Sequence, residues 1–277
     1  MREMKKYVIS LAILATLLTS CASEFNRVYK TTDNDYKYEF AKECFARGKF
    51  TQAITLLQEL VTIQKGTDNA QECLYMLAMA EYCDRDYESA SETFKKYYQT
   101  YPKGIYAEQA AFYIGQSLYQ STPEPRLDQT ATVNAISAYQ DFLDFFPESQ
   151  LKAKASSRMF ELTDKLVLKE YLSAKLYYNL GDYFGNCTNG GSNFEACIVT
   201  SENALKTYPF TTMREQFAVL IMKSKYELAR QSVEDKKIER YRDAEDECYG
   251  FINEYPESVE RKTAERYIKK CKEITKD

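Results

Sequence analysis

A repeat with a period of 37 residues limits the possible folds of this chain more than any other feature of its sequence. The segment "YEFAKECFARGKFTQAITLLQEL" (38–60) aligns with "YMLAMAEYCDRDYESASETFKKY" (75–97), and Ala41 then matches Ala78. A third copy begins near Phe112. Each copy reads as two helices joined by a short polar break, and such a hairpin buries its apolar face against the next hairpin. The repeat therefore predicts an all-α chain of stacked helical hairpins.

The copies share a closing phrase in which an aromatic residue precedes proline. Proline cannot continue a helix and disfavours the helical backbone in the residue before it, so each phrase marks a helix end. The phrases are "FKKYYQTYPKG" (94–104), "YQDFLDFFPES" (139–149), "ALKTYPFTT" (204–212) and "YGFINEYPES" (249–258). Together with the first copy, which lacks the proline, they indicate five repeats.

The pattern resembles the tetratricopeptide repeat. That repeat has small residues in both helices, an aromatic residue and a closing proline, which match Ala78, Ala90, Phe94 and Pro102. After the fifth copy the chain ends in "VERKTAERYIKKCKEITKD", a polar, amphipathic segment suited to covering the open end of a solenoid. The predicted fold class is an all-α solenoid of five tetratricopeptide-like helical hairpins with a C-terminal capping helix.

Three insertions interrupt the later copies. Residues 121–130 separate the helices of repeat three, 185–193 separate those of repeat four, and 229–243 lengthen repeat five. Insertions in solenoids usually fall on one edge, where they can contact partners, and neutral loop drift is an equal alternative. Residues 152–184 have no helix breaker before Gly181, so they predict one long helix or two stacked helices.

The N-terminus reads as a lipoprotein signal. Basic residues within positions 2–6 precede an apolar stretch over 7–18, which is shorter than the roughly 20 apolar residues of a membrane span. The following "LTSC" resembles the bacterial lipobox, in which cleavage precedes a cysteine that then carries lipid. We expect a cleaved signal peptide over 1–20 and lipidation of Cys21. An ordinary secretory signal or an uncleaved amphipathic helix is the alternative.

The residues behind Cys21 are expected to form a tether. Residues 21–33 read as a lipidated linker, and the rest of the chain as a domain held at a membrane through its lipid alone. Ala22 stands where an aspartate would favour the inner membrane, and by resemblance to lipoprotein sorting rules this favours the outer membrane. The expected location is the outer membrane, with the protein lipid-anchored and facing the periplasm.

The composition lacks side chains on which much catalysis and metal binding depend. The chain has 0 histidines, which removes the commonest general base and the commonest metal ligand. It has no glycine-rich phosphate loop, no serine elbow and no Cys-x-x-Cys pair. A net charge of −4 without a basic block argues against nucleic acid as the main partner. We therefore expect no enzymatic activity, no catalytic residues, no cofactor and no bound metal.

The chain has 8 cysteines, and an odd number remains once Cys21 is assigned to the lipid. At least one of these therefore stays unpaired or pairs with another chain. Cys187 and Cys197 flank a glycine-rich insertion and could close it with a disulfide. Buried, unpaired thiols that pack as small apolar side chains are the default reading.

Aromatic side chains recur at two positions of the first helix in repeats one to three. They are Tyr38, Tyr75 and Phe112 at the first position, and Phe45, Tyr82 and Tyr119 at the second. A spacing of seven residues is nearly two helical turns, so both positions lie on one side of the helix. Lys42, Met79 and Gln116 lie between them. In the tetratricopeptide register this side is concave, and it suits an extended peptide with aromatic and apolar side chains. Packing between neighbouring hairpins is the alternative.

The chain as a whole resembles the BamD family, the lipoprotein subunit of the machinery that folds β-barrels into the bacterial outer membrane. The resemblance rests on the lipobox, the five repeats and the cap. A further match is "TDKLVLKEYLSAKLYYNLGDYFGN" (163–186), which is similar to the fourth repeat of the family at Glu170, Ala174, Tyr177, Tyr178, Gly181 and Tyr183.

The resemblance implies a non-enzymatic adaptor with two parts. The N-terminal repeats, 34–149, would receive the C-terminal targeting strand of an unfolded outer-membrane protein. The C-terminal repeats and cap, 150–277, would dock the periplasmic domains of an integral, BamA-like barrel subunit. Such a protein contacts the membrane through its lipid anchor only and has no nucleic-acid partner.

Two other functions are compatible with parts of this pattern. Another envelope scaffold with tetratricopeptide repeats, which coordinates cell-wall synthesis or envelope constriction, is the main alternative. Such scaffolds usually add a coiled coil, and this sequence has no sustained heptads. A cell-wall hydrolase would need a catalytic domain, but the repeats and the cap occupy the chain.

Overall fold

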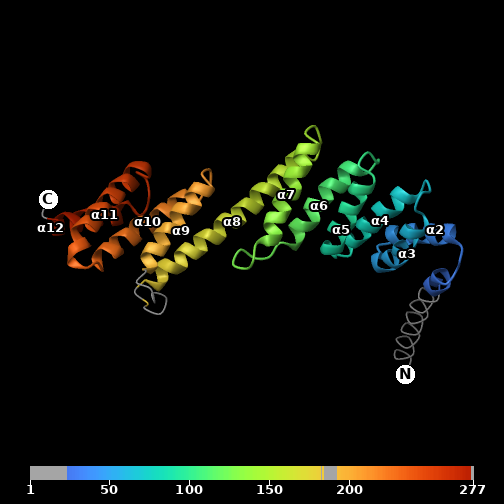
Figure 1. The fold of residues 1–277 in the computed structure, drawn as a ribbon, viewed down its shortest axis with the longest axis horizontal. Helices are drawn as coiled ribbons and strands as arrows, with labels where there is room; N and C mark the ends of the chain where they lie inside the picture. The colour runs from blue at the N-terminus through green and yellow to red at the C-terminus, as the bar shows by residue number, and fades with distance from the viewer. Residues whose placement is uncertain (1–23, 182, 184–191, 276–277) are drawn as a thin grey trace, which may run out of the picture. The chain divides into compact units, whose positions relative to one another are not determined.

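The computed structural model describes residues 24–181, 183 and 192–275 (Figure 1). Every regular element within these ranges is helical. Residues 24–29 form a short helical segment. The longer helices are α2 (Asn34–Ala46), α3 (Phe50–Ile63), α4 (Ala70–Cys83), α5 (Tyr87–Thr100), α6 (Ala107–Ser121), α7 (Thr130–Phe145), α8 (Lys152–Leu180), α9 (Asn193–Thr207), α10 (Arg214–Arg230), α11 (Glu234–Glu254) and α12 (Arg261–Thr275).

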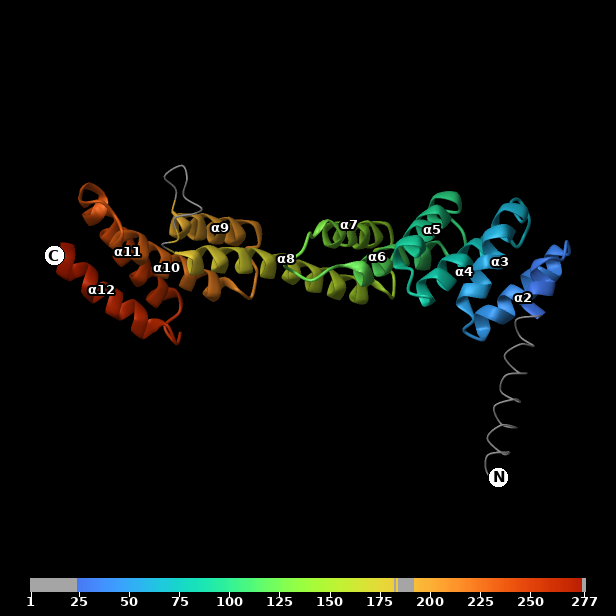
Figure 2. The same cartoon turned by 90° about the horizontal axis from the view of Figure 1, so that it is seen from below.

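Consecutive helices pack as hairpins (Figure 2). From α2 to α7, each helix contacts the next one along the chain, and so do the helices from α9 to α12. Helix α8 shares a buried cluster with α9 and α10. The hairpins are therefore α2–α3, α4–α5, α6–α7, α8–α9 and α10–α11, and α12 packs on the last of them. This confirms the predicted all-α solenoid of five helical hairpins with a C-terminal capping helix.

The turns inside the first two hairpins share a left-handed backbone. Gly48 has a φ of 71°, and Arg85, 37 residues later, has a φ of 68°. The next residue in each turn donates a backbone hydrogen bond to the preceding helix. Lys49 N donates to Cys44 O at 2.8 Å, and Asp86 N donates to Glu81 O at 3.0 Å. Such bonds satisfy carbonyls at a helix end. Glycine reaches this backbone region without steric cost, whereas arginine is strained there.

The predicted helix ends at the aromatic-proline phrases are confirmed. Helices α5, α9 and α11 end just before Tyr101, Tyr208 and Tyr255, whose φ values are −129°, −123° and −127°. Each of these tyrosines precedes a proline. Helix α7 ends at Phe145, one residue before Phe146-Pro147. One local signal therefore ends four helices.

Small residues allow the helices of a hairpin to approach closely. Ala41, Ala53, Ala78 and Ala90, at the repeated small positions of the first two copies, are all completely buried. In the third copy Gly115 takes the place of the alanine in the first helix. A Cβ atom at that position would lie 2.8 Å from Tyr139 Cδ1, which is closer than van der Waals contact allows.

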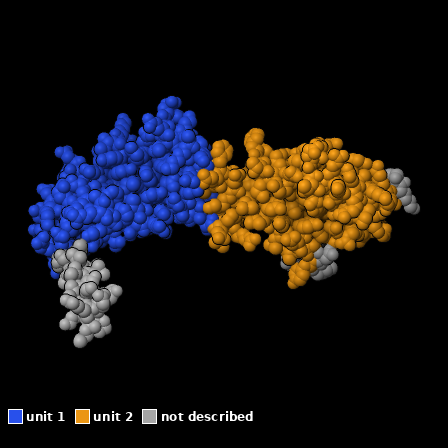
Figure 3. Space-filling view, turned by 180° about the vertical axis from the view of Figure 1, so that it is seen from behind, with its two compact units in different colours: residues 1–123, 130–159 blue, residues 124–129, 160–277 orange. Residues whose placement is uncertain are grey.

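The chain forms two compact units (Figure 3). Among the described residues, the first holds 24–123 together with 130–159, and the second holds 124–129, 160–181, 183 and 192–275. Residues 152–180 form the single helix α8, which ends before Gly181 at a φ of 46°. The 121–130 insertion lies between α6 and α7, and most of 229–243 extends α11. Most of the 185–193 insertion lies outside the described residues.

The expected tether differs from the structure. Residues 24–29 are helical, and within them Val28 is completely buried in the core of the first hairpin. Phe25 packs against the same cluster. Removing such apolar side chains from water is favourable, so this part of 21–33 joins the fold. Cys21 lies outside the described residues. In the described part of the chain, no helix combines the length and the apolar character that crossing a membrane requires.

Candidate functional site

Three of the nine side chains predicted to line a groove lie in the core. Tyr38, Phe112 and Gln116 are 3%, 1% and 4% exposed. The Gln116 side-chain oxygen accepts a 3.0 Å hydrogen bond from the Tyr139 hydroxyl. The Phe112 ring meets Phe142 edge-on at 5.5 Å between centroids. This differs from the expected groove, because a buried side chain offers no surface to a ligand. The alternative of packing between hairpins describes Tyr38, whose cluster includes side chains of α4, whereas Phe112 and Gln116 pack against α7 of their own hairpin.

Tyrosines of the second repeat join a cluster of rings. Tyr75 stacks on Tyr106 with 4.3 Å between centroids and 10° between planes. Tyr82 meets Tyr113 edge-on at 5.1 Å, and Met79 packs against the same cluster. Desolvation raises the pKa of Tyr75 well above its usual value. These three predicted groove residues are half-buried.

The remaining predicted groove residues also contact neighbours within the first unit. The Lys42 ammonium pairs with Glu39 at 2.6 Å. The Phe45 ring meets the ring of Phe50, the first residue of α3, edge-on at 5.7 Å between centroids. The Tyr119 hydroxyl accepts a 2.8 Å hydrogen bond from Arg158, whose guanidinium lies 4.4 Å from the Tyr119 ring centroid. Peptide binding by the accessible edges of these side chains stays a prediction.

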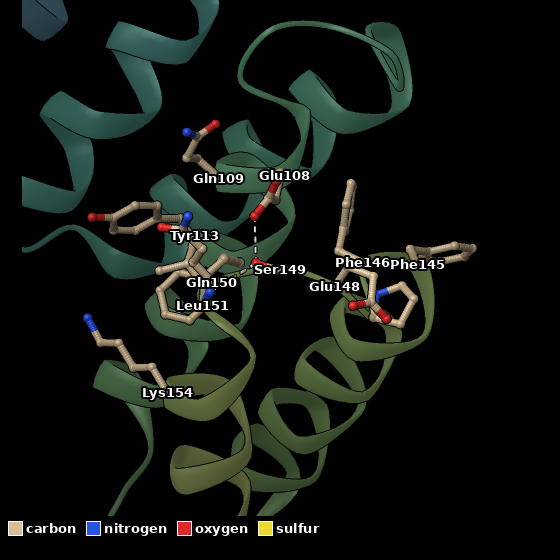
Figure 4. A pocket seen from close by; sticks show the side chains of 12 residues that line it. Glu108, Gln109, Tyr113, Phe145, Phe146, Glu148, Ser149, Gln150, Leu151 and Lys154 are labelled. Atoms are coloured by element: carbon tan, nitrogen blue, oxygen red, sulfur yellow. Dashed lines mark hydrogen bonds between the residues drawn. The ribbon is translucent and has the colours of Figure 1, made fainter.

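A pocket of about 820 Å³ opens at the turn between α7 and α8 (Figure 4). The Ser149 hydroxyl fixes this turn, because it donates to Glu108 at 2.5 Å and accepts from Leu151 N at 3.0 Å. On one side of the pocket the Lys154 ammonium lies 5.4 Å from the centroid of Phe112. The pocket therefore combines apolar rings with charges of both signs.

A second pocket, of about 600 Å³, lies between α5, α6 and α7 in the same unit. Apolar side chains of α6, including Ile114 and Leu118, form part of its lining. Phe145 lines both pockets and is 63% exposed. Its ring lies 6.2 Å from that of Tyr98. The two pockets therefore meet at Phe145 and form one surface of mixed apolar and polar side chains around it, which the sequence analysis missed. The signal for it was the doubled aromatic residue before Pro147.

The second unit has a basic pocket of about 490 Å³ where the insertion meets α8. The Lys169 ammonium donates to the Leu127 carbonyl at 3.0 Å and ties the insertion to the helix. Arg126, Lys169 and Lys175 line the pocket together with two leucines of α8. Its described lining contains no carboxylate, so it favours an anionic ligand.

The described thiols are suited to packing rather than chemistry. They are Cys44, Cys73, Cys83, Cys197, Cys248 and Cys271, all unpaired and all but Cys83 buried. Burial raises the pKa of each, to about 12 for Cys73, so they stay protonated at neutral pH. Cys187 lies outside the described residues, so its bridge to Cys197 stays a prediction. Within the described ranges, acidic residues and cysteines form no group of three with metal-binding geometry.

Comparisons with known proteins point to the bacterial outer membrane. The YfiO family model, described as "Outer membrane lipoprotein", matches residues 30–190, which is more than half of the chain. The outer membrane protein assembly factor BamD of Caulobacter vibrioides is 22% identical over 62% of this chain and 58% of its own length. A relative from Aquifex aeolicus, provisionally given the same name, is 26% identical over 49% of this chain and 43% of its own length. The chain thus spans about half the length of these curated relatives.

Among solved structures, the TPR2AB domain of yeast Sti1 in its pHSP90 complex is similar with a TM-score of 0.42 and 15% identity. The match covers 88% of this chain and 84% of that chain. A score of this size adds nothing to what the helices themselves show.

Proposed function

Because the chain belongs to the YfiO family of outer membrane lipoproteins, we propose that it is a non-enzymatic subunit of the machinery that assembles β-barrel proteins into the outer membrane. Two relatives are named as outer membrane protein assembly factors, and this supports the proposal. The chain would be anchored in the outer membrane through lipid on Cys21 and would face the periplasm.

We assign the binding of unfolded barrel proteins to the first unit. A targeting strand of such a protein is extended and carries alternate apolar and aromatic side chains, which need pockets on an exposed surface. The surface around Phe145 offers two adjoining pockets with aromatic walls. Lys154 lines one of them and would pair with a C-terminal carboxylate. The accessible edges of Tyr75 and Tyr82 are the second candidate surface.

Phe145→Ala tests this assignment. A fluorescein-labelled peptide that matches the C-terminal strand of a barrel protein from the same organism is expected to bind about tenfold more weakly, because an exposed aromatic anchor is lost. Fluorescence anisotropy gives the affinity. Phe160→Ala, which removes a phenylalanine that is 74% exposed in the second unit, is the matched control. An unchanged affinity for Phe145→Ala, or an equal loss for both variants, contradicts the assignment.

We assign the docking of the barrel subunit to the second unit. The basic pocket supports this, because its cations lie beside exposed apolar groups such as Leu176, which is 57% exposed. An acidic surface with apolar residues on a periplasmic domain of the barrel subunit would complement it.

Affinity purification from detergent-solubilised outer membrane tests the proposed function as a whole. A large integral β-barrel protein with repeated periplasmic domains is expected to co-purify. The double variant Arg126→Glu with Lys175→Glu should recover at least tenfold less of that protein. The double variant Lys269→Glu with Lys270→Glu, which reverses two exposed charges on α12, should recover the normal amount. Recovery of cell-wall or constriction proteins without any barrel protein would instead favour the envelope scaffold.

A further inference from the structure

A carboxylate with an unused acceptor lies almost wholly inside the second hairpin. Glu81 on α4 is 4% exposed, and no described residue donates a hydrogen bond to its Oε2 atom. Buried polar atoms nearly always have a hydrogen-bond partner, because burying one without a partner is costly. The Oε2 atom of Glu81 therefore lacks a hydrogen-bond donor among the described residues.

The side chain of Glu81 forms part of the wall of an open pocket of about 470 Å³. The other walls come from the first two turns of α5, where Glu88 and Glu92 lie four residues apart, as do Ser89 and Thr93. Residues at this spacing share one helix face, so two carboxylates and two hydroxyls face the same space. The described lining contains three carboxylates and no cation.

Neighbouring charges do not offset the effect of burial on the Glu81 carboxyl group. Burial is the largest influence and raises the pKa of its carboxyl group. A hydrogen bond with Thr93 lowers that pKa, the nearby Asp86 carboxylate raises it, and Lys96 lowers it least. The charged form of Glu81 is thus destabilised at a site where two further carboxylates already stand.

We propose that this pocket receives an arginine side chain of a protein partner. A guanidinium has five N–H donors in a planar fork, so it can bond to Glu88 or Glu92 and, after a side-chain rotation that turns the buried Oε2 toward the pocket, to Glu81 as well. Among the described residues, no three carboxylates have metal-binding geometry, which favours an organic cation over a metal ion. Glu92 also lines the second pocket beside Phe145, but Phe145 and Lys154 do not line this one, and the inference does not depend on the proposed function.

Small arginine derivatives test the pocket directly. Nα-acetyl-arginine amide, titrated into the ¹⁵N-labelled full chain, is expected to shift the backbone amide signals of residues 81–93 in a saturable way. Nα-acetyl-citrulline amide has nearly the same shape without the charge and is expected to shift them at least tenfold less at equal concentration. Equal shifts from both compounds, or the same shifts from Ca²⁺ or Mg²⁺ alone, would overturn the proposal.

Two variants locate the site. Glu81→Gln and Glu88→Gln are each expected to weaken the arginine derivative at least tenfold, while Glu43→Gln, on the first hairpin, leaves its affinity unchanged. Glu81→Gln removes a destabilised buried charge, so its melting temperature should equal or exceed that of the wild type. A folded Glu81→Gln protein that binds the arginine derivative with wild-type affinity would contradict the proposal.

Discussion

Phe94→Ala is expected to lower the free energy of unfolding by about 3–5 kcal/mol, the usual cost of truncating a buried phenylalanine. Phe94 is completely buried. Its ring stacks on Tyr113 at 5.3 Å between centroids and meets Tyr75 edge-on at 5.8 Å. The truncation removes apolar contact and leaves a cavity that this rigid ring cluster cannot fill. Urea unfolding followed by far-UV circular dichroism measures the change.

Phe145→Ala is the matched control for this prediction. The same atoms are removed in the same unit, but Phe145 is 63% exposed. Its loss should therefore change the free energy of unfolding by about 0.5 kcal/mol or less. Equal losses for the two variants would show that the ring cluster around Phe94 does not stabilise the hairpins.

Gly115→Ala is expected to destabilise the chain by about 1–3 kcal/mol, although alanine is the better helix former. The added Cβ atom would lie 2.8 Å from Tyr139 Cδ1. The Tyr139 ring is completely buried, and its hydroxyl is bonded to Gln116, so it cannot swing aside without losing that bond. The two helices must instead move apart. Thermal and urea unfolding report the cost.

Gly250→Ala makes the same chemical change where there is room for it. Gly250 lies within α11, and a Cβ atom there would meet nothing within 4 Å. This variant should gain about 0.5–1 kcal/mol of stability from helix propensity. A gain for both variants, or a loss for both, would contradict the close approach at Gly115.

Local signals explain why the hairpins could be predicted from the sequence. The small residues and the aromatic-proline phrases each act within a few residues, and the 37-residue spacing repeats them along the chain. They correctly placed the helix ends at Tyr101, Tyr208 and Tyr255. The equivalence of Gly48 and Arg85 also follows from the spacing, although the sequence did not reveal their shared left-handed backbone.

The exposure of a residue on a helix face depends on the helices that pack over it, and the sequence does not report this. Periodicity placed Tyr38, Tyr75 and Phe112 on one side of their helices. Whether that side stays open depends on which side chains the next helices bring over it. Tyr139 and Phe142 of α7 cover Phe112, for example. Repeat positions therefore predicted where the rings lie and failed to predict how much of each ring is covered.

The surface pockets depend on contacts between distant parts of the chain. Lys169 meets the Leu127 carbonyl across 42 residues, and Arg158 meets Tyr119 across 39. Neither pair has a sequence signal, because each requires a whole hairpin to be in place first. The basic pocket could be found only from the folded chain, and the doubled aromatic residue before Pro147 did not by itself reveal the surface around Phe145.

The burial of Val28 limits the length of the linker between the proposed lipid and the fold. With Cys21 acylated as proposed, three chain steps separate it from residue 24, which is already helical in the described part of the chain. Three chain steps of about 3.8 Å extend at most about 11 Å. A linker this short would hold the first hairpin at the depth of the lipid headgroups. The protein would then search for its partners by sliding along the membrane plane, because a long swing into the periplasm would be out of its reach.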